Sequence, residues 1–316
     1  MSETTRARVQ GAAHAGRPPS GDGYSQIEVL PRPGVIGAEV RCGDVNALTE
    51  DMTKEIRRAW SDHLVLLVRG QQLDDEKLLA FTARFGALEK GPVTNVAMGE
   101  QRQNPFICVV SNVVENGVAI GSLGNDEAIW HTDMSHIEVP PAASVLHALE
   151  VPPSGAETGF VNMYFALETL PPDVRSRTDD LTILHDGHYN SAGVRRRVAT
   201  STRHPIVCTH PDTGRDVLYL GRRPHARINE LSEAESDALL DILWAHATRD
   251  EFAWHHEWKV GDILIWDNRC AMHHRNPFDA SARRIMHRGQ TVGSRPARLN
   301  RAEPSARHTQ SALATH

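Results

Sequence analysis

The 316-residue chain lacks the features that mark several large classes of protein. It has only four cysteines, Cys42, Cys108, Cys208 and Cys270, and no C-x-x-C pair. We therefore predict reduced thiols in a cytoplasmic protein, rather than disulfides or a zinc knuckle. No apolar run approaches the roughly 18–20 residues of a membrane span, and the first residues lack the apolar core of a secretory signal.

An excess of positive charge is also missing. The chain has 34 Lys and Arg against 40 Asp and Glu, which gives a net charge of -6 with histidine neutral. Bulk electrostatics therefore offer no attraction to nucleic acid or to an anionic membrane surface, and we expect neither as a partner.

Composition divides the chain into one body and two tails. Residues 1–24 are rich in Ala, Gly, Arg, Ser and Pro, and residues 295–316 have a similar character. Both segments are predicted to be disordered. Residues 25–294 contain no internal repeat and no linker, so we predict a single domain with a substantial core there.

Three helices are predicted in that body. The first covers 46–60 with Thr49 as its N-cap, and the second runs from Asp74 to Gly86. The third covers 231–248, where Ser232 and Glu235 have the spacing of a capping box.

Short apolar runs between turn residues predict strands in most of the remaining chain. Many short strands with few helices favour a mainly β fold, either a barrel or a double-sheet jelly roll with flanking helices. The strands are expected at 63–70, 106–111, 144–151, 158–164, 204–210 and 217–221, and the stretch 261–291 is expected to form strand, loop and strand.

His131 and Asp133 are the most informative pair of polar residues. Side chains two positions apart on an extended segment point to the same side. An imidazole and a carboxylate on one side are two of the three ligands of a two-His, one-carboxylate iron(II) site. His-x-Asp also arises by chance in a chain with 18 histidines, so the pair alone does not define a metal site.

Four motifs occur in order around this pair: WHTD (130–133), GAET (155–158), WDNR (266–269) and RRIMHR (283–288). Together with RFG at 84–86 and HPI-x-x-THP-x-TGR at 204–215, they resemble the taurine dioxygenase/2,4-D dioxygenase (TauD/TfdA) family of iron(II)- and 2-oxoglutarate-dependent dioxygenases. The resemblance implies a double-stranded β-helix, or jelly-roll, core. It also implies hydroxylation of an unactivated C–H bond of a small-molecule substrate, with O2 consumed and succinate and CO2 released. Relatives commonly self-associate, so a dimer or tetramer is in keeping with it.

The resemblance also assigns roles to residues. His131, Asp133 and His273 match the metal ligands, and His274 is the rival of His273. Related iron halogenases lack the carboxylate ligand, so Asp133 favours hydroxylation over halogenation.

For 2-oxoglutarate, Thr158 and Arg284 match the residues that bind its far carboxylate, where a guanidinium offers two parallel donors. Arg288 is expected near the metal, in contact with 2-oxoglutarate or with an anionic group of the substrate. Strand alternation puts Arg284 and Arg288 on one face without saying which face is inward.

The positions around the substrate depart from the taurine pattern. Gly91 and Thr94 stand where taurine dioxygenases carry His and Tyr, and Glu127 stands where they carry Asn. Taurine itself is therefore not the expected substrate. A cation at Arg288 that faces inward predicts a different substrate that bears a carboxylate or a sulfonate. Glu127 either contacts a cation on the substrate or is an exposed loop acid. The segments 121–129 and 185–193 are expected to be loops near the pocket, the first of them a lid.

Two other functions are compatible with the residues alone. One is a metal-dependent hydrolase with the same ligands, which would need a general base and no Thr158–Arg284 pair. The other is a non-catalytic jelly-roll binding module, for which a lost metal ligand would be expected.

Overall fold

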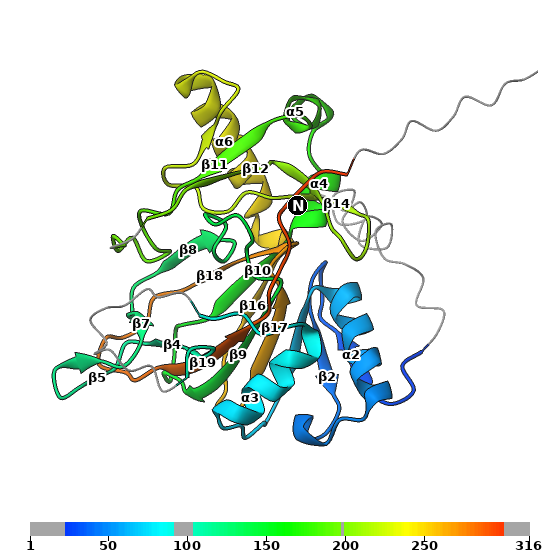
Figure 1. The fold of residues 1–316 in the computed structure, drawn as a ribbon, viewed down its shortest axis with the longest axis vertical. Coiled ribbons are helices and arrows are strands. Elements are labelled where there is room, and N and C mark those ends of the chain that lie inside the picture. The colour runs from blue at the N-terminus through cyan, green and yellow to red at the C-terminus, as the bar shows by residue number, and fades with distance from the viewer. Residues whose placement is uncertain (1–22, 92–103, 197–198, 300–316) are drawn as a thin grey trace, which may run out of the picture.

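The computed structural model describes residues 23–91, 104–196 and 199–299, and its architecture is mainly β with flanking helices (Figure 1). The larger of two main sheets has the strand order β1-β2-β3-β17-β9-β19-β4-β7. Two neighbouring pairs, β2–β3 and β4–β7, are parallel, and the other pairs are antiparallel. The strands are Glu28–Pro31 (β1), Ala38–Arg41 (β2), Val65–Val68 (β3), Ile263–Asp267 (β17), Ala143–Glu150 (β9), Ile285–Gln290 (β19), Cys108–Ser111 (β4) and Ser122–Leu123 (β7).

The second main sheet carries most of the chemistry described below. Its order is β16-β10-β18-β8, formed by Ala253–His256, Thr158–Asn162, Ala271–Arg275 and Ala128–His131. A three-stranded sheet and two hairpins complete the strands of the described chain. They are Thr202–Pro205 (β12), Thr182–His185 (β11) and Arg227–Ile228 (β15), then Val207–Thr209 (β13) with Asp216–Leu218 (β14), and Val114–Glu115 (β5) with Val118–Ala119 (β6).

The large sheet is buried on both faces, which explains why its strands read as continuous apolar runs. Val65 and Leu67 of β3 pack into the core shared with β10 and β18. Leu66 and Val68 point the other way, into the core formed with α2 (Glu50–His63) and α3 (Asp75–Thr82). Alternation along the strand therefore serves two apolar layers at once.

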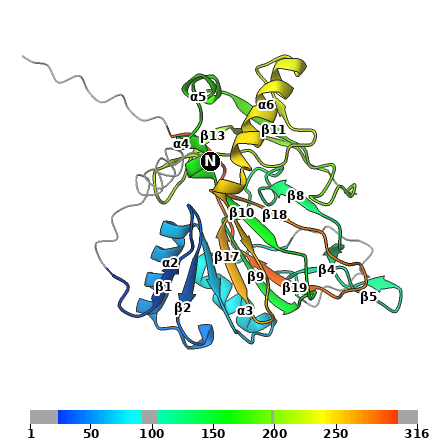
Figure 2. The ribbon, with the colours of Figure 1, turned by 180° about the vertical axis from the view of Figure 1, so that it is seen from behind.

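The predicted helix starts are confirmed. Thr49 accepts a hydrogen bond from Met52 N at the start of α2, and Asp74 caps α3. Helix α6 (Glu233–Ala247) begins with both halves of the Ser232 capping box. Figure 2 shows α6 and β11 at the end of the molecule away from α2 and α3. Short 3-10 segments lie at Val45–Ala47, Ala83–Phe85 and Asp250–Phe252.

Several predicted strands were wrong in extent. The run 158–164 ends as strand β10 at Asn162, whose side chain accepts from Tyr164 N and Phe165 N and so starts α4 (Met163–Glu168). Helix α5 (Pro172–Thr178) was also missed. The run 204–210 contributes to two strands, β12 and β13, and the stretch 261–291 contains three strands, not two.

The chain stays in contact with the body beyond residue 294. Ala297 O accepts a hydrogen bond from Thr209 N, and Leu299 N donates to Thr209 Oγ1. These contacts reach Leu299, four residues past the predicted start of the C-terminal tail at residue 295. No helix in the described part of the chain is both long enough and apolar enough to span a bilayer.

Candidate active site

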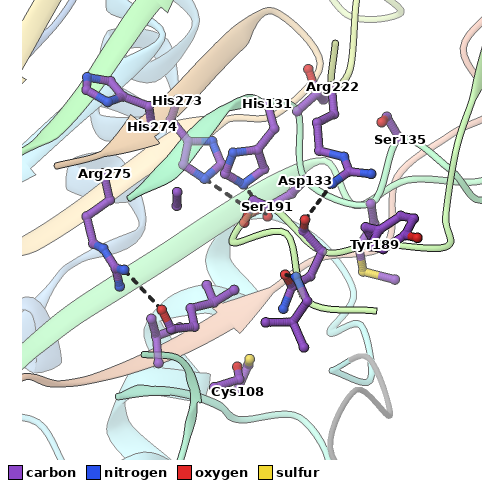
Figure 3. Close-up of a pocket in the computed structure, with 18 of the residues that line it drawn as sticks. Cys108, His131, Asp133, Ser135, Tyr189, Ser191, Arg222, His273, His274 and Arg275 are labelled. Carbon is purple, nitrogen blue, oxygen red and sulfur yellow. Dashed lines mark hydrogen bonds and ion pairs between the residues drawn. The ribbon is translucent and has the colours of Figure 1, made fainter. Parts of the chain in front are cut away.

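His131, Asp133 and His273 are brought together at the junction of β8 and β18. His131 and His273 are direct partners across these two strands, and their ring centroids lie 4.2 Å apart. Asp133 follows in the turn after β8. Its Oδ1 lies 3.7 Å from His131 Nε2, and its Oδ2 lies 4.0 Å from His273 Nε2. All three side chains are buried and point toward one another (Figure 3).

The protonation of this group suits a divalent metal. His131 Nδ1 lies 2.7 Å from Ile129 O, and a carbonyl only accepts, so Nδ1 donates to it and Nε2 is the ring nitrogen that faces Asp133. Burial and the neighbouring His131 hold the pKa of His273 well below its usual value, so this imidazole is neutral. Neutral imidazoles with one carboxylate are the donor set that divalent metals require.

The carboxylate is held by several groups at once. Arg288 Nη1 donates to Asp133 Oδ2 at 2.8 Å, and Ser144 Oγ donates to the same oxygen at 3.3 Å. Burial alone would raise the pKa of Asp133, but the charge of Arg288 outweighs burial and holds that pKa well below its usual range. Asp133 is therefore an anion throughout the neutral pH range.

Asn268 of the WDNR motif fixes the backbone of Asp133. Its Oδ1 accepts from Asp133 N at 2.8 Å, and its Nδ2 donates to Asp133 O at 2.9 Å. The two motifs, far apart in sequence, thus form one unit.

His274 lies outside the group of three. Its ring packs 4.2 Å from that of Trp130, and its Nε2 lies 3.4 Å from His255 Nδ1, away from the carboxylate (Figure 3). Gly159 of β10 pairs with His274, and a Cβ at Gly159 would stand 2.3 Å from His274 Nε2. The lack of a side chain at Gly159 is what makes room for this imidazole.

Arg284 forms a second feature of the same cavity. The side chain is 2% exposed, yet Nε and Nη1 have no hydrogen-bond partner among the described residues. Burial and the nearby Arg275 lower the pKa of Arg284 to about 9, so the guanidinium is still charged at neutral pH. A buried cation without an anion is costly, and this arrangement suits a bound carboxylate.

Thr158 lines the same cavity as Arg284. Trp258 Nε1 donates to Thr158 Oγ1 at 2.9 Å, and an indole N–H is a donor only. The Thr158 oxygen therefore acts as acceptor toward Trp258, which leaves its own O–H proton available to donate to a carboxylate in the cavity.

Arg275 is a cavity residue that the sequence reasoning missed. It donates to the backbone oxygens of Leu123 and Asp126, and it keeps a positive charge beside Arg284. Arg275 stands two positions after His273 on one strand, and alternation could have placed it on the cavity side. Trp258, by contrast, lies in no motif that we recognised.

The predicted substrate residues are placed differently. Glu127 is exposed and does not line the cavity, and Gly91 is buried with its N–H donating to Pro105 O. Thr94 lies outside the described residues. Four of the nine residues of the predicted lid, 121–129, belong to β7 and β8. The loop 185–193 does line the cavity, through residues such as Tyr189 and Asn190.

A second group of possible metal ligands, His210, Asp267 and Cys270, is better explained as structure. Arg269 and His210 together engage both oxygens of the Asp267 carboxylate, at 2.7 to 3.0 Å. Burial raises the pKa of the Cys270 thiol, with a further contribution from Asp267. His185 and His188, three apart in sequence, form no such group in the described chain.

The fold and the site together define a 2-oxoglutarate-dependent dioxygenase, and comparison with known proteins agrees. Residues 26–290 match the model of the "Taurine catabolism dioxygenase TauD, TfdA family". The chain therefore belongs to this family, as the sequence motifs had predicted. It uses 2-oxoglutarate and a metal, with O2 as cosubstrate.

Individual relatives are similar over most of their length. Pentalenolactone F synthase of Streptomyces arenae is 35% identical over 306 residues, which cover 89% of this chain and all of that protein. The alpha-ketoglutarate-dependent 2,4-dichlorophenoxyacetate dioxygenase of Cupriavidus pinatubonensis is 33% identical over 264 residues, 78% of this chain and 90% of that one. The crystal structure of AAD-2 in complex with Mn(II) and N-oxalylglycine has a TM-score of 0.71 at 29% identity, covering 86% of this chain and all of that chain.

Proposed function

We propose that the chain is an iron(II) enzyme that hydroxylates an unactivated C–H bond of a small anionic substrate. The observation that carries this proposal is the meeting, in one buried cavity, of the His131–Asp133–His273 group with the unpaired guanidinium of Arg284. A hydrolase would need the first feature and has no use for the second.

Each residue has a role in this proposal. His131, Asp133 and His273 hold iron(II), which when bound supplies the site where 2-oxoglutarate and O2 react. Arg284 and the Thr158 hydroxyl bind the far carboxylate of 2-oxoglutarate, Arg284 through paired donors. Arg288 neutralises and orients the Asp133 carboxylate. Asp133 occupies a ligand position that a halide would otherwise take, which favours hydroxylation.

An anionic substrate is supported by the charges of the cavity. Six arginines line it against two aspartates, Asp133 and Asp186. After one 2-oxoglutarate dianion is bound, cationic side chains remain to attract a second anion. One relative acts on 2,4-dichlorophenoxyacetate, which carries a carboxylate. We further infer that the eight- and four-stranded sheets are the two layers of the jelly roll.

The function is tested by iron-dependent formation of succinate from 2-oxoglutarate, with and without aryloxyacetates, sulfonates and small carboxylic acids. We expect slow succinate formation without substrate, and a marked increase with one of these classes. Replacement of Arg284 by Ala should raise the 2-oxoglutarate requirement at least tenfold while metal affinity is kept. Arg283→Ala is the matched control, because Arg283 is exposed and pairs with Glu150. If no compound gives iron-dependent succinate formation, the proposal is wrong, and a metal-dependent hydrolase or a non-catalytic binding module is favoured instead.

A further inference from the structure

The arginines of the cavity differ in what already engages them. Arg288 is paired with Asp133, and Arg222 donates to Asn190 O at 2.6 Å and to Asp186 Oδ2 at 3.3 Å. Arg275 is held by backbone oxygens of Leu123 and Asp126. Each of these three side chains has an acid or a backbone oxygen as a partner, although Nε of Arg275 and Nε of Arg288 have none among the described residues.

Arg196 is engaged in another way. It lines the cavity, and its Nη1 lies 2.6 Å from His136 Nε2. No carboxylate of the described residues forms an ion pair with Arg196, and its buried Nε has no hydrogen-bond partner there. No acid is therefore paired directly with Arg196, and Asp133 and Asp186 act on its charge only from a longer distance.

His136 orients this guanidinium without cancelling its charge. Burial, with Arg196 and Arg222, lowers the pKa of His136 to about 4, so the imidazole is neutral at pH 7. A guanidinium has no lone pair to accept with, so Nε2 of His136 must be the acceptor. The remaining donors of Arg196 stay available for an anion.

The backbone before Arg196 is tied to the cavity wall. Arg196 N donates to His188 O at 2.7 Å, and Asn190 Oδ1 accepts from Ala192 N and Val194 N. Figure 3 shows this wall, marked by Tyr189, Ser191 and Arg222, on the other side of the metal-ligand group from Arg275. Arg275 lies beside Arg284, as its effect on the pKa of Arg284 shows.

We propose that Arg196, oriented by His136, binds the anionic group of the primary substrate, a carboxylate or a sulfur oxyanion. This inference rests on the proposed function, in which Arg284 binds 2-oxoglutarate at the other end of the cavity. The cavity then has two anion-binding ends with the metal ligands between them. A substrate anchored at Arg196 presents its remaining atoms toward the metal, while Arg288 keeps its ion pair with Asp133.

The test uses full-length protein loaded with Mn(II) and N-oxalylglycine, an unreactive analogue of 2-oxoglutarate. Calorimetry measures binding of phenoxyacetate, phenyl sulfate and benzenesulfonate, and of 2-phenoxyethanol as the uncharged counterpart. We expect wild-type protein to bind at least one anion more tightly than the alcohol. Arg196→Gln should weaken that anion at least tenfold and leave the alcohol unchanged.

Two further variants complete the test. Arg196→Lys keeps the charge without the paired donors and should weaken the anion less than Arg196→Gln. Arg227→Gln removes an exposed arginine of β15 and should have no effect.

Three outcomes overturn the inference: wild-type protein binds none of the anions, Arg196→Gln binds them as wild type does, or it loses the alcohol equally. If the Mn(II) protein fails to bind N-oxalylglycine at all, the proposed function fails instead. Equal N-oxalylglycine affinity in all four proteins keeps the two questions apart.

Discussion

The side-chain amide of Asn268 forms a reciprocal pair of hydrogen bonds with the backbone of Asp133, and donates a third to Pro141 O at 3.0 Å. Asn268 is 1% exposed, so water cannot easily replace these hydrogen bonds if the amide is removed. The backbone that carries the Asp133 carboxylate is thus held by a residue more than a hundred positions away.

Replacing Asn268 by Ala should therefore weaken metal binding. Outer groups that orient a ligand are typically worth about 10–100-fold in metal affinity, and we expect a loss in this range for Mn(II) measured by titration. Asn229→Ala is the control, since Asn229 also donates to a backbone oxygen, Thr182 O, and does not line the cavity. Loss of stability in Asn268→Ala with unchanged metal affinity would contradict the orienting role.

Replacing Arg284 by Met should abolish 2-oxoglutarate binding without lowering the melting temperature of the ligand-free protein. The variant removes a buried charge that has no acid to pair with among the described residues, so little native stabilisation is lost. The measurement is thermal unfolding with and without 2-oxoglutarate in the presence of Mn(II). Wild-type protein should be stabilised by the ligand and the variant should not. A large drop in the melting temperature of the ligand-free variant would show that Arg284 has a structural partner.

Replacing Trp258 by Phe tests whether the indole N–H sets the direction of the Thr158 hydroxyl. One hydrogen bond contributes about 0.5–1.5 kcal/mol, so 2-oxoglutarate affinity should fall by roughly 2–10-fold. Trp254→Phe is a suitable control, because Trp254 packs on Phe160 and is not bonded to Thr158. Thr158→Val should lose at least as much affinity as Trp258→Phe, and the double variant should lose little more. Full additivity of the two losses would refute the coupling.

Acid should destabilise the protein well before its carboxylates titrate. Burial lowers the pKa of His185, His204, His246 and His256 in the folded chain. In the unfolded chain these histidines have a pKa of about 6.5. Below that pH the unfolded chain therefore binds more protons than the folded chain, in which the buried imidazoles stay neutral. The stabilisation that the neutral histidines contribute is fully present above about pH 6.5 and is lost progressively as the pH falls below that value.

The measurement is urea unfolding at several pH values between 7.5 and 5 without added metal. His246→Gln, which lies outside the cavity, should reduce the pH slope of the unfolding free energy by up to one proton. Asp133 and Asp267 act in a separate window, because their lowered pKa values make stability fall further only below about pH 4. A stability that stays constant from pH 7 to 5 would contradict the account of the histidines.

Local signals in the sequence predicted helix starts well and strand ends poorly. Thr49, Asp74 and Ser232 cap helices by accepting from the backbone N–H three positions on, and such bonds leave a pattern in the sequence. Asn162 acts in the same way, but it follows four buried strand residues, and the apolar run continues into α4. Nothing in hydrophobicity marks the change from strand to helix there.

The motif residues of the site were predictable, and the contacts between distant segments were not. His131, Asp133, Thr158, His273, Arg284 and Arg288 all line one cavity, as expected from the family resemblance. Glu127 and Gly91 were chosen by equivalence to positions that surround a different substrate, and neither reaches the cavity. Arg196 and Trp258 owe their places to contacts with His136 and Thr158, which no spacing along the chain reveals.

The pairing of β10 with β18 has a consequence for how the chain finds its correct alignment. His273 and His274 are chemically identical, so a one-residue slip of β18 would still offer an imidazole to a metal and would exchange the two faces. Only the partner strand distinguishes them: Phe160 stands opposite His273, and Gly159 stands opposite His274. In a strand slipped by one residue, His274 could stand opposite Phe160, and its ring would lose the room that Gly159 provides. Gly159 therefore favours the register in which His273, and not His274, faces Asp133.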